Sequence, residues 1–132
     1  MSSVSELTAS YSADHVASAA PVLSKALKRA VELLGLSGDE LAAILGLSAS
    51  SVSRLRHDRL LVEPDSKPGQ LALVLLRVFR SLDALVGSRD ELARQWLRTP
   101  NADLGAVPID LLKRADGLVR VGQYLDAVRG SA

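Results

Sequence analysis

The chain has 132 residues, a formal net charge of +1 and no cysteine. The lack of cysteine excludes a disulfide framework and a thiolate metal site, and two histidines are too few for a histidine-based metal cluster. A net charge so close to zero neither requires nor excludes nucleic acid as a partner.

The pattern of hydrophobic residues predicts the fold class. A hydrophobic content of 48% is enough for a core, and the apolar residues recur at helical spacing rather than in alternation. We therefore predict an all-α protein. The longest apolar run, Leu71–Leu76, is too short to cross a bilayer, and the N-terminus lacks the pattern of a signal peptide. We expect a cytoplasmic protein without a membrane partner, a metal or a cofactor.

Residues 1–20 are rich in serine and alanine, and their few distinctive side chains are Glu6, Asp14 and His15. One interpretation is an arm that binds a partner. The other is a loosely held tail, because chain termini are often poorly ordered. We predict a flexible N-terminal arm over this range.

The first predicted helix begins near Pro21 and ends at Gly35. Proline suits the first turn of a helix, and glycine suits the position after the last turn. Leu23, Leu27 and Leu34 lie on one face of this segment. The spacing therefore predicts an amphipathic helix with its apolar side in the core.

Two shorter helices are predicted to follow. Ser37 and Glu40 have the spacing of a capping box and open the second helix. Gly46 ends it in a left-handed turn, and Ser48 caps a third helix over Ala49–His57. Two short helices joined by a tight turn with glycine are typical of a helix-turn-helix, and this stretch resembles the Xre/Cro class of such motifs.

The predicted helix-turn-helix domain, residues 21–66, offers a candidate DNA-binding surface on its third helix. Serine reads few base differences, and only Arg54 can bond bidentately to a guanine. The other two arginines suit DNA phosphates. The alternative is a motif that serves as a scaffold, with solvated basic residues. The candidate DNA-binding residues are Ser48, Ala49, Ser50, Ser53, Arg54, Arg56 and Arg59.

A linker with two prolines, residues 60–69, leads to a long predicted helix over residues 70–86. One face of this helix repeats at steps of four and three, as in a heptad, and the other carries Leu73, Leu76 and Phe79. A helix this apolar needs partners on two sides, so we predict a homodimer. The alternative is that one chain buries both faces. The candidate dimer-interface residues are Leu71, Leu75, Val78, Leu82 and Leu85.

Three further helices are predicted towards the C-terminus. Ser88 and Glu91 repeat the capping-box spacing, and Pro100 ends the helix that they open. A short helix begins at Pro108. The last helix covers residues 116–128, where apolar residues at steps of three and four make one stripe: Leu118, Val121, Leu125 and Val128.

Several short motifs follow one another in this last third of the chain: Ala93-Arg94-Gln95-Trp96-Leu97, Thr99-Pro100-Asn101, Leu104-Gly105, Pro108, Leu111-Leu112 and Tyr124-Leu125. In order and spacing they resemble the C-terminal toxin-binding domain of the MbcA/ParS/Xre antitoxins. Two positions depart from that family. Gly122 stands where an acidic residue is usual, and Gly105-Ala106 stands where Gly-Gly is common.

The resemblance implies an antitoxin of a type II toxin–antitoxin system, whose C-terminal part covers the active site of a toxin. This part lies within residues 67–132, which also contain the dimerisation helix. Many partner toxins of the family are RES-domain enzymes that degrade NAD, and others in related systems are ADP-ribosylating. The antitoxin is also expected to bind operator DNA and to regulate its own operon.

The resemblance and the side-chain chemistry together suggest which residues meet the toxin. Sites that consume NAD commonly hold arginines for the pyrophosphate, so Asp126 or the terminal carboxylate of Ala132 can occupy that place. Tyr124 is of a type enriched at interface hot spots. The alternative is that Tyr124 and Leu125 pack the last helix onto Trp96. The candidate toxin-binding residues are Arg98, Asn101, Asp103, Tyr124, Asp126, Arg129 and Ala132.

Two other functions compete with this hypothesis. The chain could be a free-standing transcriptional regulator whose C-terminal domain only dimerises. It could also be an enzyme, but its acidic residues lie at helix starts and on solvated faces, where carboxylates are expected for structural reasons. No Ser/His/Asp order and no phosphate-cradling glycine loop is present. We therefore predict that the chain is not an enzyme.

Overall fold

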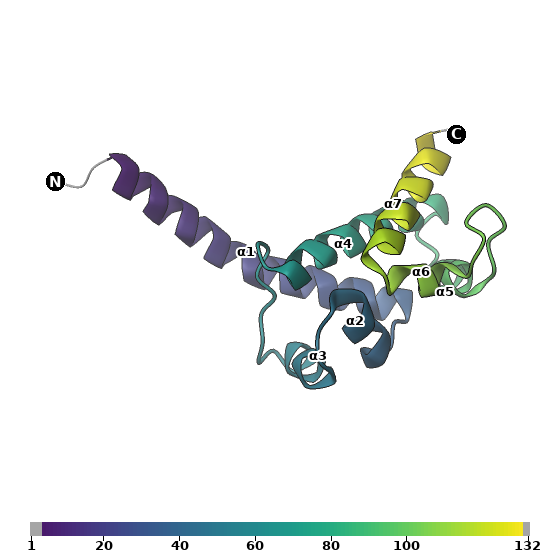
Figure 1. Ribbon diagram of the computed structural model, residues 1–132, viewed down its shortest axis with the longest axis horizontal. Helices are drawn as coiled ribbons and strands as arrows, with labels where there is room; N and C mark the ends of the chain where they lie inside the picture. The colour runs from purple at the N-terminus through teal and green to yellow at the C-terminus, as the bar shows by residue number, and fades with distance from the viewer. Residues whose placement is uncertain (1–3, 131–132) are drawn as a thin grey trace.

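The computed structural model describes the backbone of residues 4–130 and the side chains of residues 19–130. Within this range all the named secondary-structure elements are α-helices, which confirms the predicted fold class, and no helix is long and apolar enough to cross a membrane. Figure 1 shows the arrangement of the seven described helices: α1 (Val4–Leu34), α2 (Gly38–Leu45), α3 (Ala49–Arg56), α4 (Lys67–Leu85), α5 (Asp90–Arg98), α6 (Pro108–Leu112) and α7 (Ala115–Gly130).

Helix α4 lies at the centre of the fold, because α1, α2, α5 and α7 all pack on it. Its side chains Leu75, Val78 and Leu82 are 0% exposed. The face predicted to meet a second copy is therefore buried in the chain's own core, and this assignment of the dimer interface is wrong for these three residues. Leu71 is half-buried, and Leu85 is exposed.

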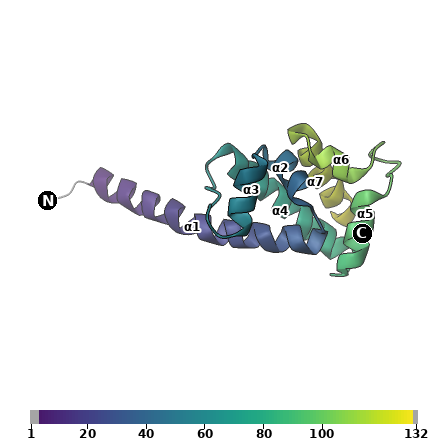
Figure 2. The same cartoon turned by 90° about the horizontal axis from the view of Figure 1, so that it is seen from below.

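Helix α1 is longer than the sequence suggested. It begins at Val4 instead of near Pro21, and it runs through that proline to Leu34. Proline removes one helical hydrogen bond, and here the helix continues across the gap. The backbone of residues 4–20, which we expected to be a flexible arm, is thus helical, and both views show its first half projecting from the body (Figures 1 and 2).

The helix-turn-helix forms as predicted. The Ser37 hydroxyl accepts from the Glu40 amide at 3.1 Å, and the Glu40 carboxylate accepts from the Ser37 amide at 2.9 Å, which completes the capping box. Gly46 ends α2 with a φ of 68°, a left-handed conformation that glycine adopts without strain. The side chains of Val52 and Leu55 lie on the inner face of α3 and are buried in the core.

The linker between α3 and α4 is fixed to the rest of the fold. The Val62 amide donates to the buried Ser24 hydroxyl of α1 at 2.8 Å. A Cβ at Gly69 would lie 1.8 Å from the Glu63 carbonyl oxygen, so only glycine lets the linker pass this close to α4. Because Ser66 caps α4, this helix begins earlier than predicted.

The predicted start of α5 is wrong in one respect. Ser88 has a φ of 60°, and its hydroxyl donates to Asp83 at 3.0 Å. An N-cap residue needs extended backbone, so Ser88 cannot complete a capping box with Glu91. Arg89 stands at the N-cap instead, and its side chain makes no capping bond to the helix. Helix α6 begins at Pro108, as predicted, and α7 covers the predicted last helix.

Candidate functional site

The N-terminus of α3 carries an exposed group of serines. The Ser48 hydroxyl caps the helix by accepting from the Ser51 amide at 3.1 Å, and it also lies 3.1 Å from the Ser50 hydroxyl and 3.0 Å from the Ser51 hydroxyl. Ala49, Ser50 and Ser53 are exposed, as a surface that enters a DNA groove requires. The structure thus brings these predicted residues together on one face.

Two arginines extend this face. Arg54 is exposed and lies 3.2 Å from the Ser51 hydroxyl, to which it donates. Arg59 is exposed just after α3, and its amide donates to the Arg54 carbonyl at 2.7 Å, which fixes the turn that carries it. His57 contacts the Ser53 carbonyl at 2.7 Å through Nδ1. The arrangement can place two guanidinium groups on DNA beside the serines.

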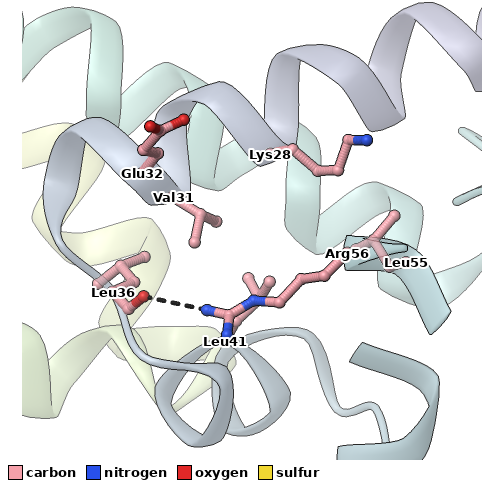
Figure 3. A pocket seen from close by; sticks show the side chains of 7 residues that line it. All are labelled: Lys28, Val31, Glu32, Leu36, Leu41, Leu55 and Arg56. Carbon is pink, nitrogen blue, oxygen red and sulfur yellow. Dashed lines mark hydrogen bonds between the residues drawn. The ribbon is translucent and has the colours of Figure 1, made fainter. Parts of the chain in front are cut away.

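Arg56 has a different position from the other predicted DNA contacts. Its guanidinium lies across a cleft of about 410 Å³ between α1, α2 and α3, and Nη2 donates to the Leu36 carbonyl at 3.4 Å (Figure 3). A Cβ added at Gly38 would lie 3.3 Å from Arg56 Nη1. Arg56 therefore ties α3 to the turn before α2 instead of extending from the exposed face.

The segment between α5 and α6 forms a tight loop on the opposite half of the molecule. The Asn101 amide donates to the Ala106 carbonyl at 3.0 Å, and the Gly105 amide donates to the Asn101 carbonyl at 2.8 Å. The Asn101 side chain accepts from the Leu104 amide at 3.0 Å. Gly105 supports the turn with a φ of 69°. Asn101 therefore shapes the loop, and Asp103 at its tip is exposed.

Tyr124 links helix α7 to this loop. Its ring stacks on Trp96 of α5 with centroids 6.3 Å apart, and its hydroxyl donates to Asp103 at 2.9 Å. The hydrogen bond to the Asp103 carboxylate, together with desolvation, raises the pKa of Tyr124 above its usual value. Leu125 is 0% exposed. The alternative that Tyr124 packs the last helix onto Trp96 thus holds for its ring, while its hydroxyl bonds to the exposed Asp103.

Asp126 does not extend freely from α7. Its carboxylate accepts from the Ser81 hydroxyl at 2.6 Å and from Arg77 at 2.6 Å and 2.9 Å, so it binds α7 to α4. The bond from Ser81, followed by that from Arg77, lowers the pKa of Asp126 below its usual value. The carboxylate expected to meet the toxin is therefore already engaged within the chain.

Arg98 is engaged in the same way. It donates to both Glu40 carboxylate oxygens, at 2.9 Å and 3.0 Å, and to the Gly35 carbonyl at 3.0 Å. Arg94, one turn earlier, donates to the Leu33 carbonyl at 3.0 Å. The hydrogen bond from Arg98 lowers the pKa of Glu40 from 4.5 to about 2. These two arginines join α5 to the end of α1 and the start of α2.

Of the other predicted toxin contacts, Arg129 is exposed near the end of α7, and Ala132 lies outside the described residues. The sequence analysis missed Val119, which is 42% exposed beside the exposed Gln123. The signal was available, because Val119 is an apolar residue that lies off the stripe of α7. Val119 and Gln123 line a hollow with Val74 and Arg77 of α4, whereas Asp103 and the hydroxyl of Tyr124 lie together and make the outer face of the C-terminal half.

Comparison with known families covers most of the chain. Residues 14–77 match the Antitoxin Xre-like helix-turn-helix domain. Residues 81–130 match the Antitoxin Xre/MbcA/ParS C-terminal toxin-binding domain. No curated protein sequence matches the chain. The two matched ranges follow each other along the chain, and the second contains α5, α6 and α7.

Proposed function

Since the chain belongs to the antitoxins that join an Xre-like helix-turn-helix to an Xre/MbcA/ParS toxin-binding domain, we propose that it neutralises a RES-type, NAD-degrading toxin by covering its active site. Both matched domains belong to binding families, so we also propose that the chain has no catalytic activity of its own. Its partners in this proposal are the cognate toxin, operator DNA and a second copy. Operator binding would place it in the cytoplasm.

The observation that supports neutralisation most directly is the preorganised outer face of the C-terminal half. The Trp96–Tyr124 stack and the Tyr124–Asp103 bond hold loop and helix together before any partner arrives. A surface fixed in its bound shape loses little conformational entropy on association. We assign the contacts with the toxin to Asp103, Tyr124 and Arg129, with Asn101 shaping the loop.

Arg98 and Asp126 have another role in this proposal. Each is tied to another helix of the chain, Arg98 to α2 and Asp126 to α4. In this proposal Arg98 and Asp126 hold the outer face in position, and other residues contact the toxin. Asp103, which is exposed at the tip of the loop, then becomes the acidic residue that we assign to arginines of the toxin.

DNA binding is assigned to the exposed residues of α3 and of the turn that follows it. Arg54 would read a guanine, and Arg59 would bind a phosphate. Because the toxin and the DNA meet opposite halves of the chain, the same molecule can repress its operon while it holds the toxin. This part of the proposal rests on the family match and on the exposure of both arginines.

The test is co-expression of the chain with the toxin encoded by the adjacent gene, with growth and cellular NAD as readouts. Asp103→Arg reverses the charge at the loop tip, so protection should fall and NAD should be depleted. Asp65→Arg makes the same change on the exposed linker, and this control should protect fully. Full protection by Asp103→Arg, at wild-type protein level, would contradict the assigned surface.

Point substitutions are preferable to truncation in this experiment. Removal of residues 123–132 would take the fully buried Leu125 from the core and break the bridge from Asp126 to Arg77 and Ser81. Loss of protection by such a chain would report unfolding of α7. A toxin that neither binds the wild-type chain nor is inhibited by it would favour a free-standing transcriptional regulator.

A further inference from the structure

The end of α1 is bound by an arginine from another helix. Figure 2 shows α5 beside the end of α1, and the two helices pack against each other. Arg94 of α5 donates to the Leu33 carbonyl at 3.0 Å and to the Glu32 carbonyl at 3.4 Å. Helix α1 has no basic residue in its own last turn, although a cation stabilises the C-terminal end of a helix. Helix α5 therefore supplies the cation that α1 lacks.

Arg98, one turn further along α5, binds both the end of α1 and the start of α2. It donates to the Gly35 carbonyl at 3.0 Å and to both oxygens of the Glu40 carboxylate. Glu40 also belongs to the capping box of α2, since its carboxylate accepts from the Ser37 amide at 2.9 Å. Arg98 therefore holds the turn that leaves α1 together with the first turn of α2.

The same turn is also bound to α3. Arg56 Nη2 donates to the Leu36 carbonyl at 3.4 Å (Figure 3), and α2, which follows the turn, packs on α3. Arg54, which is proposed to read a guanine, lies on α3 two positions before Arg56. A shift of the turn would therefore move the side chains that are proposed to meet DNA.

The bonds from Arg94 and Arg98, here called the interdomain contact, join the two matched family domains. Both arginines lie within residues 81–130, the toxin-binding domain, whereas their acceptors lie within residues 14–77, the helix-turn-helix domain. Helices α2 and α3 have only eight residues each. Helices this short gain most of their stability from packing, so their position depends on what holds them.

We infer that Arg94 and Arg98 are positioning residues for DNA binding, because they hold residues 32–40, and through them α3, at the angle that a specific operator requires. A helix in the major groove reads bases with a few side chains in fixed geometry, whereas long cationic side chains can still reach phosphates after a small shift. Loss of the interdomain contact should therefore reduce specificity more than binding to DNA in general. The inference rests on the DNA binding proposed above and assigns part of it to the toxin-binding domain.

The test compares two affinities of the full chain, one for DNA from upstream of its gene and one for a shuffled duplex of the same length. In the double variant Arg94→Ala, Arg98→Ala the ratio of these affinities should fall about fivefold or more, which is the effect of losing one base contact. A fraction of unfolded chain would weaken binding to both duplexes equally. The ratio therefore separates a change in the position of α3 from a loss of stability.

Arg77→Ala is the matched control. Arg77 is an exposed arginine that donates two bonds to a carboxylate, as Arg98 does, but it joins α4 to α7 instead of the turn between α1 and α2. Its removal should keep the wild-type ratio.

Glu40→Gln tests the same contact from the other side. The amide oxygen can still accept from the Ser37 amide, while the ion pair with Arg98 is lost. Glu40→Gln and Arg98→Ala should each lower the ratio, and their effects should not add in the double variant, because both remove one contact. These single variants decide the matter if Arg94→Ala, Arg98→Ala does not fold.

Each contrary result has a distinct meaning. An unchanged ratio in variants that are folded by circular dichroism would overturn the inference. So would an equal loss of affinity for both duplexes, which would limit the two arginines to a contribution to stability. A wild-type chain without preference for the upstream DNA would overturn both the inference and the DNA binding on which it rests. Asp103→Arg leaves the interdomain contact intact, so it should lose toxin inhibition and keep the wild-type ratio.

Discussion

The exposed face of α3 and the outer face of the C-terminal half present their functional side chains in different ways. Arg54 on α3 and Arg59 just after it are exposed, and the short serines around Ser48 bond mainly to one another. In the C-terminal half, charged and aromatic residues bond to other elements, as Tyr124 does with Asp103 of the loop and Asp126 does with Arg77 of α4.

The difference fits the partners that each face is proposed to meet. DNA offers a regular row of phosphates, which flexible cationic side chains can follow without a fixed geometry. A protein active site has one shape, so a surface that covers it gains from side chains that are already held in place. The comparison predicts that substitutions on α3 change binding alone, whereas substitutions behind the C-terminal face also change stability.

A large loss of stability is expected where α7 passes α6. A Cβ at Gly117 would lie 2.2 Å from the Leu111 carbonyl oxygen, so Gly117→Ala forces the backbone apart. We expect the free energy of unfolding to fall by about 2–3 kcal/mol, as in overpacked cores. Gly130→Ala is the control, since nothing lies within 4 Å of its added Cβ. Urea denaturation measures both, and equal stability of the two variants would contradict the account.

Substitutions on α3 should weaken DNA binding and spare the fold. If Arg54 reads a guanine, Arg54→Ala should weaken binding to one preferred DNA sequence by about 1–3 kcal/mol. Arg59→Ala should weaken all sequences alike and reduce the salt dependence. Mobility shifts with DNA from upstream of the gene measure the first effect, and a salt titration measures the second. If neither substitution changes the shift, α3 is only a scaffold.

The Arg98–Glu40 pair predicts a dependence of stability on pH. The pKa of Glu40 is lowered from 4.5 to about 2, so the unfolded chain binds the proton more readily. The pair therefore stabilises the fold above pH 4.5, and this stabilisation is lost as the pH falls towards 2. Because the Arg98 side chain is 46% exposed, solvent screens the pair, and we expect it to contribute about 1 kcal/mol.

Arg98→Ala should remove that contribution and flatten this part of the pH profile. Denaturation at pH 7 and at pH 3, for wild type and variant, measures the change. Arg120→Ala, which removes an exposed arginine of α7, serves as the control and should keep the wild-type slope. A variant with an unchanged slope would show that the pair contributes nothing.

A small gain in stability is expected in the middle of α7. Gly122 is buried against α4, yet an added Cβ would lie 3.6 Å from Val78 Cγ2, which is an ordinary contact. Gly122→Ala should therefore stabilise the chain by about 0.5–1 kcal/mol through helix propensity alone. Thermal denaturation measures the gain. A loss of stability would mean that α7 needs a closer approach to α4 at this point.

Local signals predicted much of the fold, because they act over a few residues. The Ser37 capping box, the left-handed Gly46 and the start of α6 at Pro108 all follow from nearest neighbours in the chain. The spacing around Ser88 is equally regular, but a bond to Asp83 and a left-handed backbone override it. A capping pattern thus predicts a helix start only where the backbone can be extended.

The remaining differences involve contacts between distant parts of the chain. Arg98 meets Glu40 and Asp126 meets Ser81 across dozens of residues, and local spacing does not reveal such pairs. The apolar face of α4 shows the same limit. Its periodicity predicted that Leu75 and Leu82 are buried, but it could not distinguish burial by α7 of the same chain from burial by a second copy.

The central claim is that one chain carries two separable surfaces, and a crossed measurement on the purified toxin complex tests it most directly. Asp103→Arg and Arg54→Ala are each assayed for inhibition of NAD consumption by the toxin and for binding to operator DNA. The account predicts that Asp103→Arg loses inhibition and keeps DNA binding, while Arg54→Ala keeps inhibition and loses DNA binding. Loss of both activities in either folded variant, or inhibition unaffected by Asp103→Arg, would contradict it.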